Sequence, residues 1–250
     1  MKDPLVSIIT VVFNNENTIL DAVKSVLNQS YKNIEYIIID GKSTDNTLKK
    51  LKPFSKKIHK IISEKDSGIY DAMNKGLTFA NGEIIGILNS DDFYLNNNVI
   101  KSVVDAFDSK IDIVYGNLFY VDQFDTNKIV RKWKSSQFKK GSFSSGWHPP
   151  HPSFFVKKKM YKNLGNFNIN LKIAADFELM LRFMENNNSS SFFLNKYLVK
   201  MRLGGESNLS LRNVILGHKN FRESFKLNNI KPVPFYSFFR IISKLKQYIR

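Results

Sequence analysis

The sequence predicts an α/β domain with a mainly parallel central sheet flanked by helices, and two observations lead to this prediction. In the first hundred residues, short apolar runs rich in Val and Ile alternate with segments whose apolar residues recur at helical spacing. The apolar runs show no two-residue period, which is typical of strands buried on both faces of a parallel sheet. Alternation of strands and helices at this spacing indicates an α/β fold.

The helices of this first part have recognisable ends. The first places Thr18 and Asp21 as a capping box would, and the second stops before Pro53. The third is expected to be capped by Ser67 and to end at Asn81-Gly82. The expected strands cover 6–13, 34–40, 57–64 and 83–89, and the expected helices cover 17–29, 45–51 and 67–80.

The second part of the chain is less regular. Two runs rich in strand-forming residues predict a hairpin, and a segment rich in Gly, Ser and Pro predicts a loop. A strand, a helix, an amphipathic helix, another strand and two final helices are expected to follow. The hairpin is expected at 112–122 and 128–134, the loop at 141–153, the strand and helix within 153–165, the amphipathic helix at 176–186, the last strand at 190–203, and the final helices after Asn208, the second at 234–250.

Length and composition limit the class of protein. A chain of 250 residues that is 42% hydrophobic can form one large domain, or a domain with an appendage. It contains no cysteine, which excludes disulfides, thiolate zinc sites and a cysteine nucleophile. We see no signal peptide in MKDPLVSIIT and no apolar run near the roughly 20 residues that span a bilayer. We therefore expect a cytoplasmic protein, free or bound peripherally to the inner face of the membrane.

The net charge of +16 is unevenly distributed along the chain. Residues 1–130 contain 15 Lys and Arg against 17 Asp and Glu, whereas residues 131–250 contain 23 against 5. The second part should therefore favour anionic partners such as nucleic acid, acidic lipid headgroups or phosphorylated substrates. A basic, solvated surface without a partner is the alternative.

Acidic residues follow four predicted strands at the points where these strands end. They are Glu16, Asp40, Asp66 and the adjacent pair Asp91-Asp92 in GILNSDDFYLNN. In open α/β sheets, ligands bind beyond the carboxyl ends of the strands. One such residue alone is easily explained as a turn or helix cap, but four at one edge indicate a binding site.

The loop after the first strand indicates which kind of site this is. A dinucleotide-binding domain or a P-loop needs a glycine-rich turn to hold phosphate, and the loop FNNENT contains no glycine. A divalent metal could neutralise phosphate charge instead, and carboxylate oxygens suit Mg²⁺ or Mn²⁺. We therefore expect Asp91-Asp92 to hold a metal-bound diphosphate.

Three stretches together resemble a known family: VSIITVVFNNENTILDAVKSVLNQSYKNIEYIIIDGKSTDNT, EKDSGIYDAMNKG and ILNSDD. They look like the inverting, nucleotide-sugar-dependent glycosyltransferases of the large bacterial family with the GT-A fold (family 2 type), in the subgroup that builds surface polysaccharides. The resemblance runs over roughly residues 4–205. It implies a GT-A fold, a divalent cation (Mg²⁺ or Mn²⁺), and transfer of a hexosyl or N-acetylhexosaminyl group.

The resemblance also implies the partners and the domain layout. The donor would be a nucleotide sugar, UDP-linked or similar, and the acceptor a saccharide or lipid-linked saccharide. The family's processive polymerases carry a Gln-x-x-Arg-Trp motif and membrane helices, which this sequence lacks, so we expect one sugar per encounter. The expected layout is a GT-A domain at 1–206, with a nucleotide-binding half at 1–100 and an acceptor half at 101–206, and a basic helical extension at 207–250.

Residue roles in the donor site are implied by the same likeness. Asp92 would bind the metal, and Asp91 would lie near the ribose or the metal. Phe13 stands where the family often has a tyrosine, so stacking could persist without the hydroxyl contact. Ser90-Asp91 departs from a strict Asp-x-Asp, which leaves the division of roles between the two aspartates open. The residues expected to line the nucleotide pocket are Thr10, Phe13, Asp40 and Asp66, the last two facing the base.

Inverting transfer is a single displacement that needs a carboxylate to accept a proton from the acceptor hydroxyl. The segment IAADFELMLR resembles the family segment that carries this base, which would be Asp176. Asp176 could also be only the N-cap of the 177–186 helix, and Glu178 in the first turn is explained by the helix dipole. The acidic residues available in the second part are Asp176, Glu178, Glu185, Glu206 and Glu223.

The proline-rigid segment GWHPPHPSFF offers further candidates. Trp147 could stack against the acceptor. The family often has a histidine before such an apolar strand, which favours His151 over His148 as a contact to the diphosphate or metal. Gly204-Gly205 resembles a loop that closes over the donor, and a plain tight turn is the alternative.

The end of the chain combines apolar and aromatic residues with Arg and Lys over 232–250. This composition suits an interfacial helix attracted to anionic lipid, which would bring the enzyme to a lipid-linked acceptor. Packing against its own domain, or against a second subunit in a homo-oligomer, is the alternative.

Two other function classes are the alternatives to a glycosyltransferase. A sugar-nucleotide nucleotidyltransferase would be expected to show a glycine-rich, arginine-containing phosphate loop after the first strand, which FNNENT is not. A nucleic-acid-binding protein would be expected to show aromatic–basic platforms or a recognition motif. Neither feature is present, and the acidic strand ends would repel a polyanion, so we expect no nucleic-acid partner.

Overall fold

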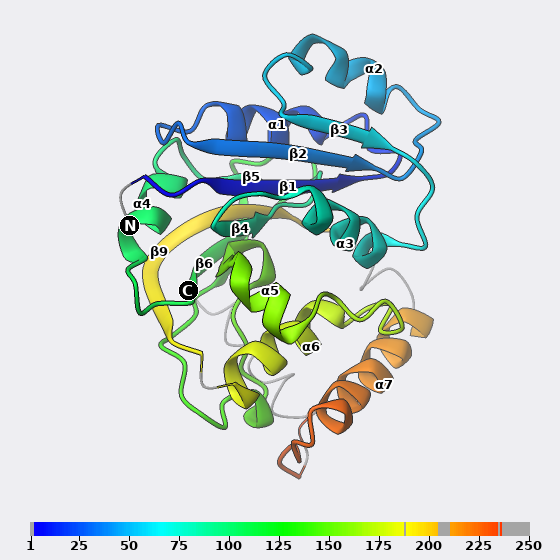
Figure 1. Ribbon diagram of the computed structural model, residues 1–250. Coiled ribbons are helices and arrows are strands. Elements are labelled where there is room, and N and C mark those ends of the chain that lie inside the picture. The colour runs from blue at the N-terminus through cyan, green and yellow to red at the C-terminus, as the bar shows by residue number, and fades with distance from the viewer. Residues whose placement is uncertain (1–2, 188, 205–210, 235, 237–250) are drawn as a thin grey trace.

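The computed structural model describes residues 3–187, 189–204, 211–234 and 236. Within them, one nine-stranded mixed sheet crosses the molecule in the order β3-β2-β1-β4-β8-β6-β9-β5, and β7 pairs with β6 (Figure 1). Helices pack on both faces of this sheet. The predicted α/β class with a central sheet flanked by helices is confirmed.

The first part of the chain forms the parallel side of the sheet. Strand β1 pairs in parallel with β2 and β4, and β2 pairs in parallel with β3. All seven residues of β1 are buried, as expected for a strand covered on both faces. The strands are β1 Val6–Val12, β2 Ile34–Asp40, β3 Lys60–Ser63 and β4 Ile84–Ile87, connected by α1 Ile19–Leu27, α2 Thr47–Leu51 with the 3₁₀ turn η1 Lys52–Phe54, and α3 Ile69–Phe79.

Two predicted helix starts are wrong in detail. Thr18 precedes α1, but its hydroxyl donates to Asn15 Oδ1 at 2.7 Å instead of capping the helix, and Asp21 forms an ion pair with Arg202. Ser67 does not cap α3, because Gly68 takes the N-cap position with φ of 121°. This left-handed conformation costs glycine little, so the chain turns into the helix there.

In the second part of the chain, an antiparallel strand lies between parallel ones. Strand β8 (Phe154–Lys157) runs antiparallel between β4 and β6 (Ile113–Val121). Consequently the start of β8, with the preceding 3₁₀ turn η3 (His151–Ser153), lies at the edge where β4 ends. The predicted hairpin is confirmed as β6 and β7 (Ile129–Trp133). Two further strands complete the sheet: β9 Ser191–Arg202, parallel to β6, and the short β5 Phe93–Tyr94, which the sequence reading missed.

Helices α5, α6 and α7 share one hydrophobic core with α3. Helix α6 packs against α7, with ring centroids of Phe177 and Phe221 4.7 Å apart and those of Phe177 and Phe225 5.6 Å apart (Figure 1). The described part of the predicted 207–250 extension therefore packs on the domain, whereas the predicted helix at 234–250 lies almost wholly outside the described residues. The remaining helices are α4 Val99–Ala106, η2 Phe143–Ser145, α5 Lys158–Leu164, α6 Ala175–Leu181 with its π-helical continuation η4 Arg182–Asn186, and α7 Leu211–Leu227.

Two hydrophobic cores fill the two faces of the sheet. One contains residues of α3, α5, α6 and α7, and the other contains residues of α1 and α4. Among the described residues, no helix is both long enough and apolar enough to cross a bilayer.

Candidate functional site

Five of the predicted site residues lie where β1, β2 and β4 end: Phe13, Asp40, Asp66, Asp91 and Asp92. The register pairs Val12 with Asp40, and Asp40 with Ser63, so the ends of these parallel strands are level. Phe13 directly follows β1, and the segment Asn89–Asp92 follows β4. This edge of the sheet is where α/β proteins bind ligands.

Phe13, Gly41 and Asp66 form one wall of the edge. A Cβ atom on Gly41 would lie 2.5 Å from Asp66 Oδ2 and 3.3 Å from the Phe13 ring, so a larger residue would displace the Asp66 carboxylate from its place beside Phe13. The Phe13 side chain is 62% exposed, although it is large and apolar. The structure thus brings together an open aromatic face and a carboxylate, and Gly41, which sequence reasoning missed, allows their approach.

Asp40 ends β2 and is fully buried. Its Oδ2 atom accepts hydrogen bonds from Ser43 N at 3.1 Å and from Ser63 Oγ at 2.6 Å. Its Oδ1 atom is buried and has no hydrogen-bond partner within the described part of the chain. One oxygen therefore holds the loop, and the other is left for a donor group from a ligand.

Thr10 does not join this group. It lies inside β1 with no exposed surface, and its hydroxyl accepts a hydrogen bond from Tyr36 Oη at 3.1 Å. Because both faces of β1 are covered, the Thr10 side chain lies in the core and not on the surface of the edge. The structure therefore does not bring its side chain to the predicted nucleotide pocket.

Asp92 is fully buried beyond the end of β4. Its Oδ2 atom lies 3.5 Å from Asn89 Nδ2, while Asp92 Oδ1 and Asn89 Oδ1 are buried without a hydrogen-bond partner among the residues described. Burial, and then the neighbouring charge of Asp91, raise the pKa of Asp92 well above its usual value. Burial also raises the pKa of Asp91. The pair is thus a concentration of negative charge that the protein only partly compensates.

Arg202, at the end of β9, is a cation whose charge acts on the pKa of both aspartates. Sequence reasoning missed this residue. It is almost fully buried, its Nη1 atom donates to the Asp91 carbonyl oxygen at 2.6 Å, and its Nη2 atom pairs with Asp21. Its charge opposes the rise in pKa of both Asp91 and Asp92. The only sequence signal was an arginine at the end of a predicted strand.

The donor atoms at this point fit a hard divalent cation. Asp91 and Asp92 offer carboxylates, and Asn89 offers an amide oxygen with no partner in the described residues. Mg²⁺ and Mn²⁺ prefer such oxygens and take the rest of their shell from water and substrate phosphates. In the described ranges, no three His, Cys, Asp or Glu side chains form a metal-binding group. The role of His151 at the metal stays a prediction.

Asp176 is the second residue of α6, and the N-cap is Ala174. The interpretation of Asp176 as an N-cap is therefore wrong. The carboxylate is partly exposed, and its Oδ1 atom accepts a hydrogen bond from Tyr70 Oη at 3.0 Å. Burial, and then the charge of Asp176, raise the pKa of Tyr70 well above its usual value.

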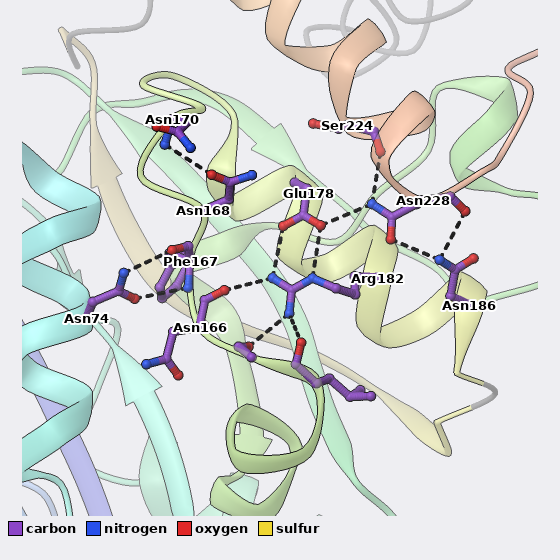
Figure 2. Close-up of polar contacts among 12 residues, drawn as sticks. Asn74, Asn166, Phe167, Asn168, Asn170, Glu178, Arg182, Asn186, Ser224 and Asn228 are labelled. Atoms are coloured by element: carbon purple, nitrogen blue, oxygen red, sulfur yellow. Dashed lines mark hydrogen bonds and ion pairs between the residues drawn. The ribbon is translucent and has the colours of Figure 1, made fainter.

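Two other acidic candidates of the second part are bound within the protein. Glu178 accepts hydrogen bonds from Arg182 at both oxygens, each at 2.9 Å, and another from Asn228 at 3.0 Å (Figure 2). This ion pair, more than the helix dipole, explains the buried Glu178. Glu185 accepts from the backbone amides of Gly141 and Phe143. Of the remaining candidates, Glu223 lies on α7, and Glu206 lies outside the described residues.

His151 lies on the Asp176 side of the site. Burial lowers the pKa of His151, and the charge of Asp176 opposes that shift. Its ring lies edge-on to Phe167, with centroids 6.1 Å apart. His148 is engaged elsewhere, with Nδ1 3.1 Å from the Pro149 carbonyl oxygen and its ring against Trp133 and Phe177.

Trp147 is partly buried in an aromatic cluster with Tyr115, Phe138 and Phe143. Its Nε1 atom is buried and has no hydrogen-bond partner in the described ranges. Its predicted contact with an acceptor stays a prediction. Gly204 has φ of 118°, as a tight turn requires, and Gly205 lies outside the described residues.

Comparison with known proteins places this site in a family. Residues 7–166 match the family model described as Glycosyl transferase family 2. The chain belongs to glycosyl transferase family 2. The predicted family and the predicted enzyme class, a glycosyltransferase, are thereby confirmed.

Curated relatives of this family 2 glycosyltransferase include two informative matches. An uncharacterized glycosyltransferase of Mycobacterium tuberculosis, Rv1514c, is 32% identical over 184 residues, which cover 72% of this chain and 68% of the relative. WfgD of Escherichia coli is 36% identical over 138 residues, covering 55% of this chain and 53% of WfgD. Its name describes a UDP-Glc:α-D-GlcNAc-diphosphoundecaprenol β-1,3-glucosyltransferase.

Solved structures share the fold. Staphylococcus aureus TarS (residues 1–349), solved with UDP-GlcNAc, matches with a TM-score of 0.68 and 17% identity, covering 94% of this chain and 69% of TarS. The mannosyltransferase PcManGT of Pyrobaculum calidifontis was solved with GDP-Man and Mn²⁺. It matches with a TM-score of 0.66 and 15% identity, covering 98% of this chain and 69% of PcManGT. These matches confirm the predicted GT-A fold of this family 2 glycosyltransferase.

Proposed function

We propose that this enzyme is a metal-dependent, inverting glycosyltransferase that moves one sugar from a nucleotide-diphosphate sugar to a saccharide or lipid-linked saccharide. The observation that carries the proposal is the buried Asp92 carboxylate, which has an oxygen without a partner in the described residues beside the unpartnered Asn89 amide oxygen. Leaving such groups unsatisfied costs free energy, so a positively charged ligand is their natural complement.

The nucleotide would bind between the ends of β1 and β2. The exposed Phe13 ring offers a stacking face for the base, and Asp66 lies beside it. Asp40 Oδ1, buried without a partner in the described ranges, can accept a hydrogen bond from a base N–H group. The name of WfgD contains UDP-Glc, TarS was solved with UDP-GlcNAc, and PcManGT was solved with GDP-Man. These three molecules support a nucleotide-sugar donor here without choosing among them.

Asp92 and Asp91 would hold Mg²⁺ or Mn²⁺, with the Asn89 amide oxygen available beside them. A bound cation supplies charge stabilisation to the departing diphosphate. Arg202 contributes by holding the Asp91 carbonyl oxygen and pairing with Asp21 on α1, which fixes the loop that carries both aspartates. The Mn²⁺ bound by PcManGT supports this choice of cation.

Asp176 would be the general base. Its carboxylate is partly exposed, whereas Glu178 and Glu185 are each occupied by several hydrogen bonds within the protein. In a single displacement, the acceptor oxygen forms a bond to the anomeric carbon as the bond to the diphosphate breaks, and the acceptor proton passes to Asp176. Trp147 is the proposed acceptor contact, and the lipid-linked acceptor in the name of WfgD supports a similar acceptor class.

Donor hydrolysis without an acceptor sugar tests this proposal, because water can then take the acceptor's place. UDP-Glc, UDP-GlcNAc and GDP-Man are incubated with the enzyme, with Mn²⁺ or with a chelator, and release of free sugar is measured. We expect release from one donor with Mn²⁺ and none with the chelator. The released sugar should have the inverted anomeric configuration, and Asp176→Asn should abolish release but preserve nucleotide binding. Equal turnover with the chelator, retained configuration, or turnover by the variant would contradict the corresponding part of the proposal.

A further inference from the structure

Tyr70 connects the nucleotide half of the molecule to the proposed base. It lies in the first turn of α3 and is almost completely buried. Its hydroxyl lies 3.0 Å from Asp176 Oδ1 and 3.1 Å from the Ile173 carbonyl oxygen. Asp176 lies in the first turn of α6 and Ile173 directly precedes its N-cap, so one side chain of α3 holds the point where α6 begins.

The same face of α3 holds the chain that leads to α6. The Tyr70 ring stacks on Phe167, with centroids 5.7 Å apart and 22° between the ring planes. One turn later, Asn74 donates from Nδ2 to the Phe167 carbonyl oxygen at 2.9 Å and accepts from Phe167 N at 3.0 Å (Figure 2). Helix α3 therefore grips the segment from Phe167 to Asp176 near both of its ends.

The residues directly before that segment, and Ile173 within it, are also held by hydrogen bonds from outside α3. Arg182 donates to the carbonyl oxygens of Gly165 at 2.9 Å and Asn166 at 2.8 Å, while Glu178 holds its guanidinium group in place (Figure 2). Ile173 N donates to Asn220 Oδ1, on α7, at 3.2 Å. With these anchors, the position of Asp176 depends on α3 and not on α6 alone.

Helix α3 begins directly after the nucleotide wall. Gly68 N donates to Asp66 Oδ1 at 2.9 Å, and Tyr70 follows Asp66 by four residues, two of them in the turn that leads into α3. A short stretch of backbone therefore joins Asp66, which is proposed to face the nucleotide base, to Tyr70, which bonds Asp176. Such a connection restrains the distance between the nucleotide-sugar donor and the proposed general base, Asp176.

We propose that Tyr70 is a positioning residue that orients the Asp176 carboxylate toward the acceptor hydroxyl, an inference that rests on the proposed role of Asp176 as base. When the single Tyr70 hydroxyl proton is directed at Oδ1 and not at the Ile173 carbonyl oxygen, Oδ2 is left to accept the acceptor's proton. Burial keeps this hydroxyl protonated, because it raises the pKa of Tyr70 well above 10. Small displacements of a catalytic group can lower the rate by up to about a hundredfold.

Tyr70→Phe tests the proposal, because it removes the hydroxyl but keeps the ring that stacks on Phe167. Tyr161→Phe is the matched control, since Tyr161 is also buried and its ring also contacts Phe167, at 6.3 Å, but its hydroxyl does not bond Asp176. Sugar release from UDP-Glc, UDP-GlcNAc and GDP-Man is measured with Mn²⁺. We expect Tyr70→Phe to lower kcat by about 10- to 100-fold with an unchanged donor KM, and Tyr161→Phe to change neither.

Unchanged kcat in Tyr70→Phe, or an equal loss in both tyrosine variants, would overturn the positioning role. Turnover that survives Asp176→Asn would instead overturn the proposed base. A double-mutant cycle of Tyr70→Phe and Asp176→Ala, which removes the acceptor oxygen, followed by urea unfolding, tests the contact without any turnover. We expect the two shifts in unfolding midpoint not to add, because both variants break the same hydrogen bond. Additive shifts would overturn the proposal.

Discussion

Two carboxylates are buried at opposite ends of the parallel strands, and their surroundings differ. Glu35 lies at the start of β2 and is 4% exposed, whereas Asp92 lies beyond the end of β4 and is 0% exposed. Both side chains have lost nearly all contact with water. Only the contacts that replace water distinguish them.

Glu35 is fully supplied with donors. It accepts hydrogen bonds from Ser7 Oγ, from Asn81 N at 2.7 Å and from Asn81 Nδ2 at 2.8 Å, and His59 Nε2 lies 3.5 Å away. Although burial acts to raise it, the pKa of Glu35 falls below its usual 4.5, because Ser7 and Asn81 donate to the charged form. This carboxylate joins β1, β2 and the connection between α3 and β4.

Asp92 has fewer and weaker donors within the described part of the chain. Its one side-chain hydrogen bond, to Asn89, is 3.5 Å long, its Oδ1 atom has no partner in the described part of the chain, and its pKa is raised. A buried carboxylate with all its donors stabilises the fold, whereas one without them is available to a ligand. Burial alone therefore does not identify a functional acid. A buried carboxylate oxygen without a hydrogen-bond partner is the more informative sign.

The largest expected effect is on activity, in Asp92→Asn. A cation that stabilises the leaving diphosphate is worth several kcal/mol, so kcat with Mn²⁺ should fall by about a thousandfold. Thermal unfolding without metal should occur at the same or a higher temperature, because the variant removes a buried charge that has few donors. Asp105→Asn, at an exposed ion pair on α4, is the control and should change neither quantity. Full activity, or a large loss of stability, in Asp92→Asn would remove the distinction between the two carboxylates.

Glu35→Gln should show the opposite pattern. Replacing one carboxylate oxygen by NH₂ sets donor against donor, and loss of the charged hydrogen bonds should lower the free energy of unfolding by about 2–3 kcal/mol. Turnover below the unfolding temperature should stay at the wild-type level. Urea unfolding measures the first quantity, and Glu64→Gln, at an exposed ion pair with Lys75, provides a comparison with an expected loss below about 1 kcal/mol. Lost turnover in folded Glu35→Gln would show that this end of the sheet also serves the reaction.

Phe13→Ala should weaken donor binding by about tenfold, since base stacking contributes about 1–3 kcal/mol. Phe13 is 62% exposed, so stability should hardly change. Calorimetric titration with UDP and GDP in Mn²⁺ measures the effect. Phe124→Ala removes a phenylalanine that is 91% exposed in the turn between β6 and β7, and serves as the control. If both variants bind alike, the aromatic wall has no part in nucleotide binding.

The smallest expected effect is a pH dependence of stability at the Glu35 end. The pKa of Glu35 is lower in the folded chain, so its contribution is present above the unfolded value near 4.5 and is lost as the pH falls below it. The difference in unfolding free energy between wild type and Glu35→Gln should therefore be constant from pH 7 to pH 6 and shrink toward pH 3. Urea unfolding at a series of pH values measures it, and a difference that grows on acidification would show that the sign is wrong.

Most of the parallel half could be predicted from the sequence. Runs such as VSIITVV predict strands because burial on both faces leaves no polar positions, and acids at the strand ends meet because parallel strands end at one edge. The orientation of β8 could not be predicted, because an apolar pattern does not encode strand direction. The burial of Thr10 and its hydrogen bond with Tyr36 could not be predicted either, because a fully buried strand gives no sign of which face a polar side chain takes.

Long-range contacts explain most of what was missed in the site. Arg202 bonds a carbonyl oxygen 111 positions away in the chain, and Tyr70 bonds a carboxylate 106 positions away. Neither residue shows a local pattern that suggests these partners. The partial satisfaction of Asp92 could not be read from the sequence either, since it depends on the absence of donors in three dimensions.

Calorimetric titration with UDP and GDP, in the presence and absence of Mn²⁺, tests most directly whether the Asp92 end binds a metal diphosphate. We predict that one nucleotide binds wild-type protein at least about tenfold more tightly with Mn²⁺ than without it, since the cation joins carboxylates to phosphates. In Asp92→Asn this gain should disappear, although binding without metal should remain. Equal affinity with and without Mn²⁺, or an undiminished gain in the variant, would contradict the account.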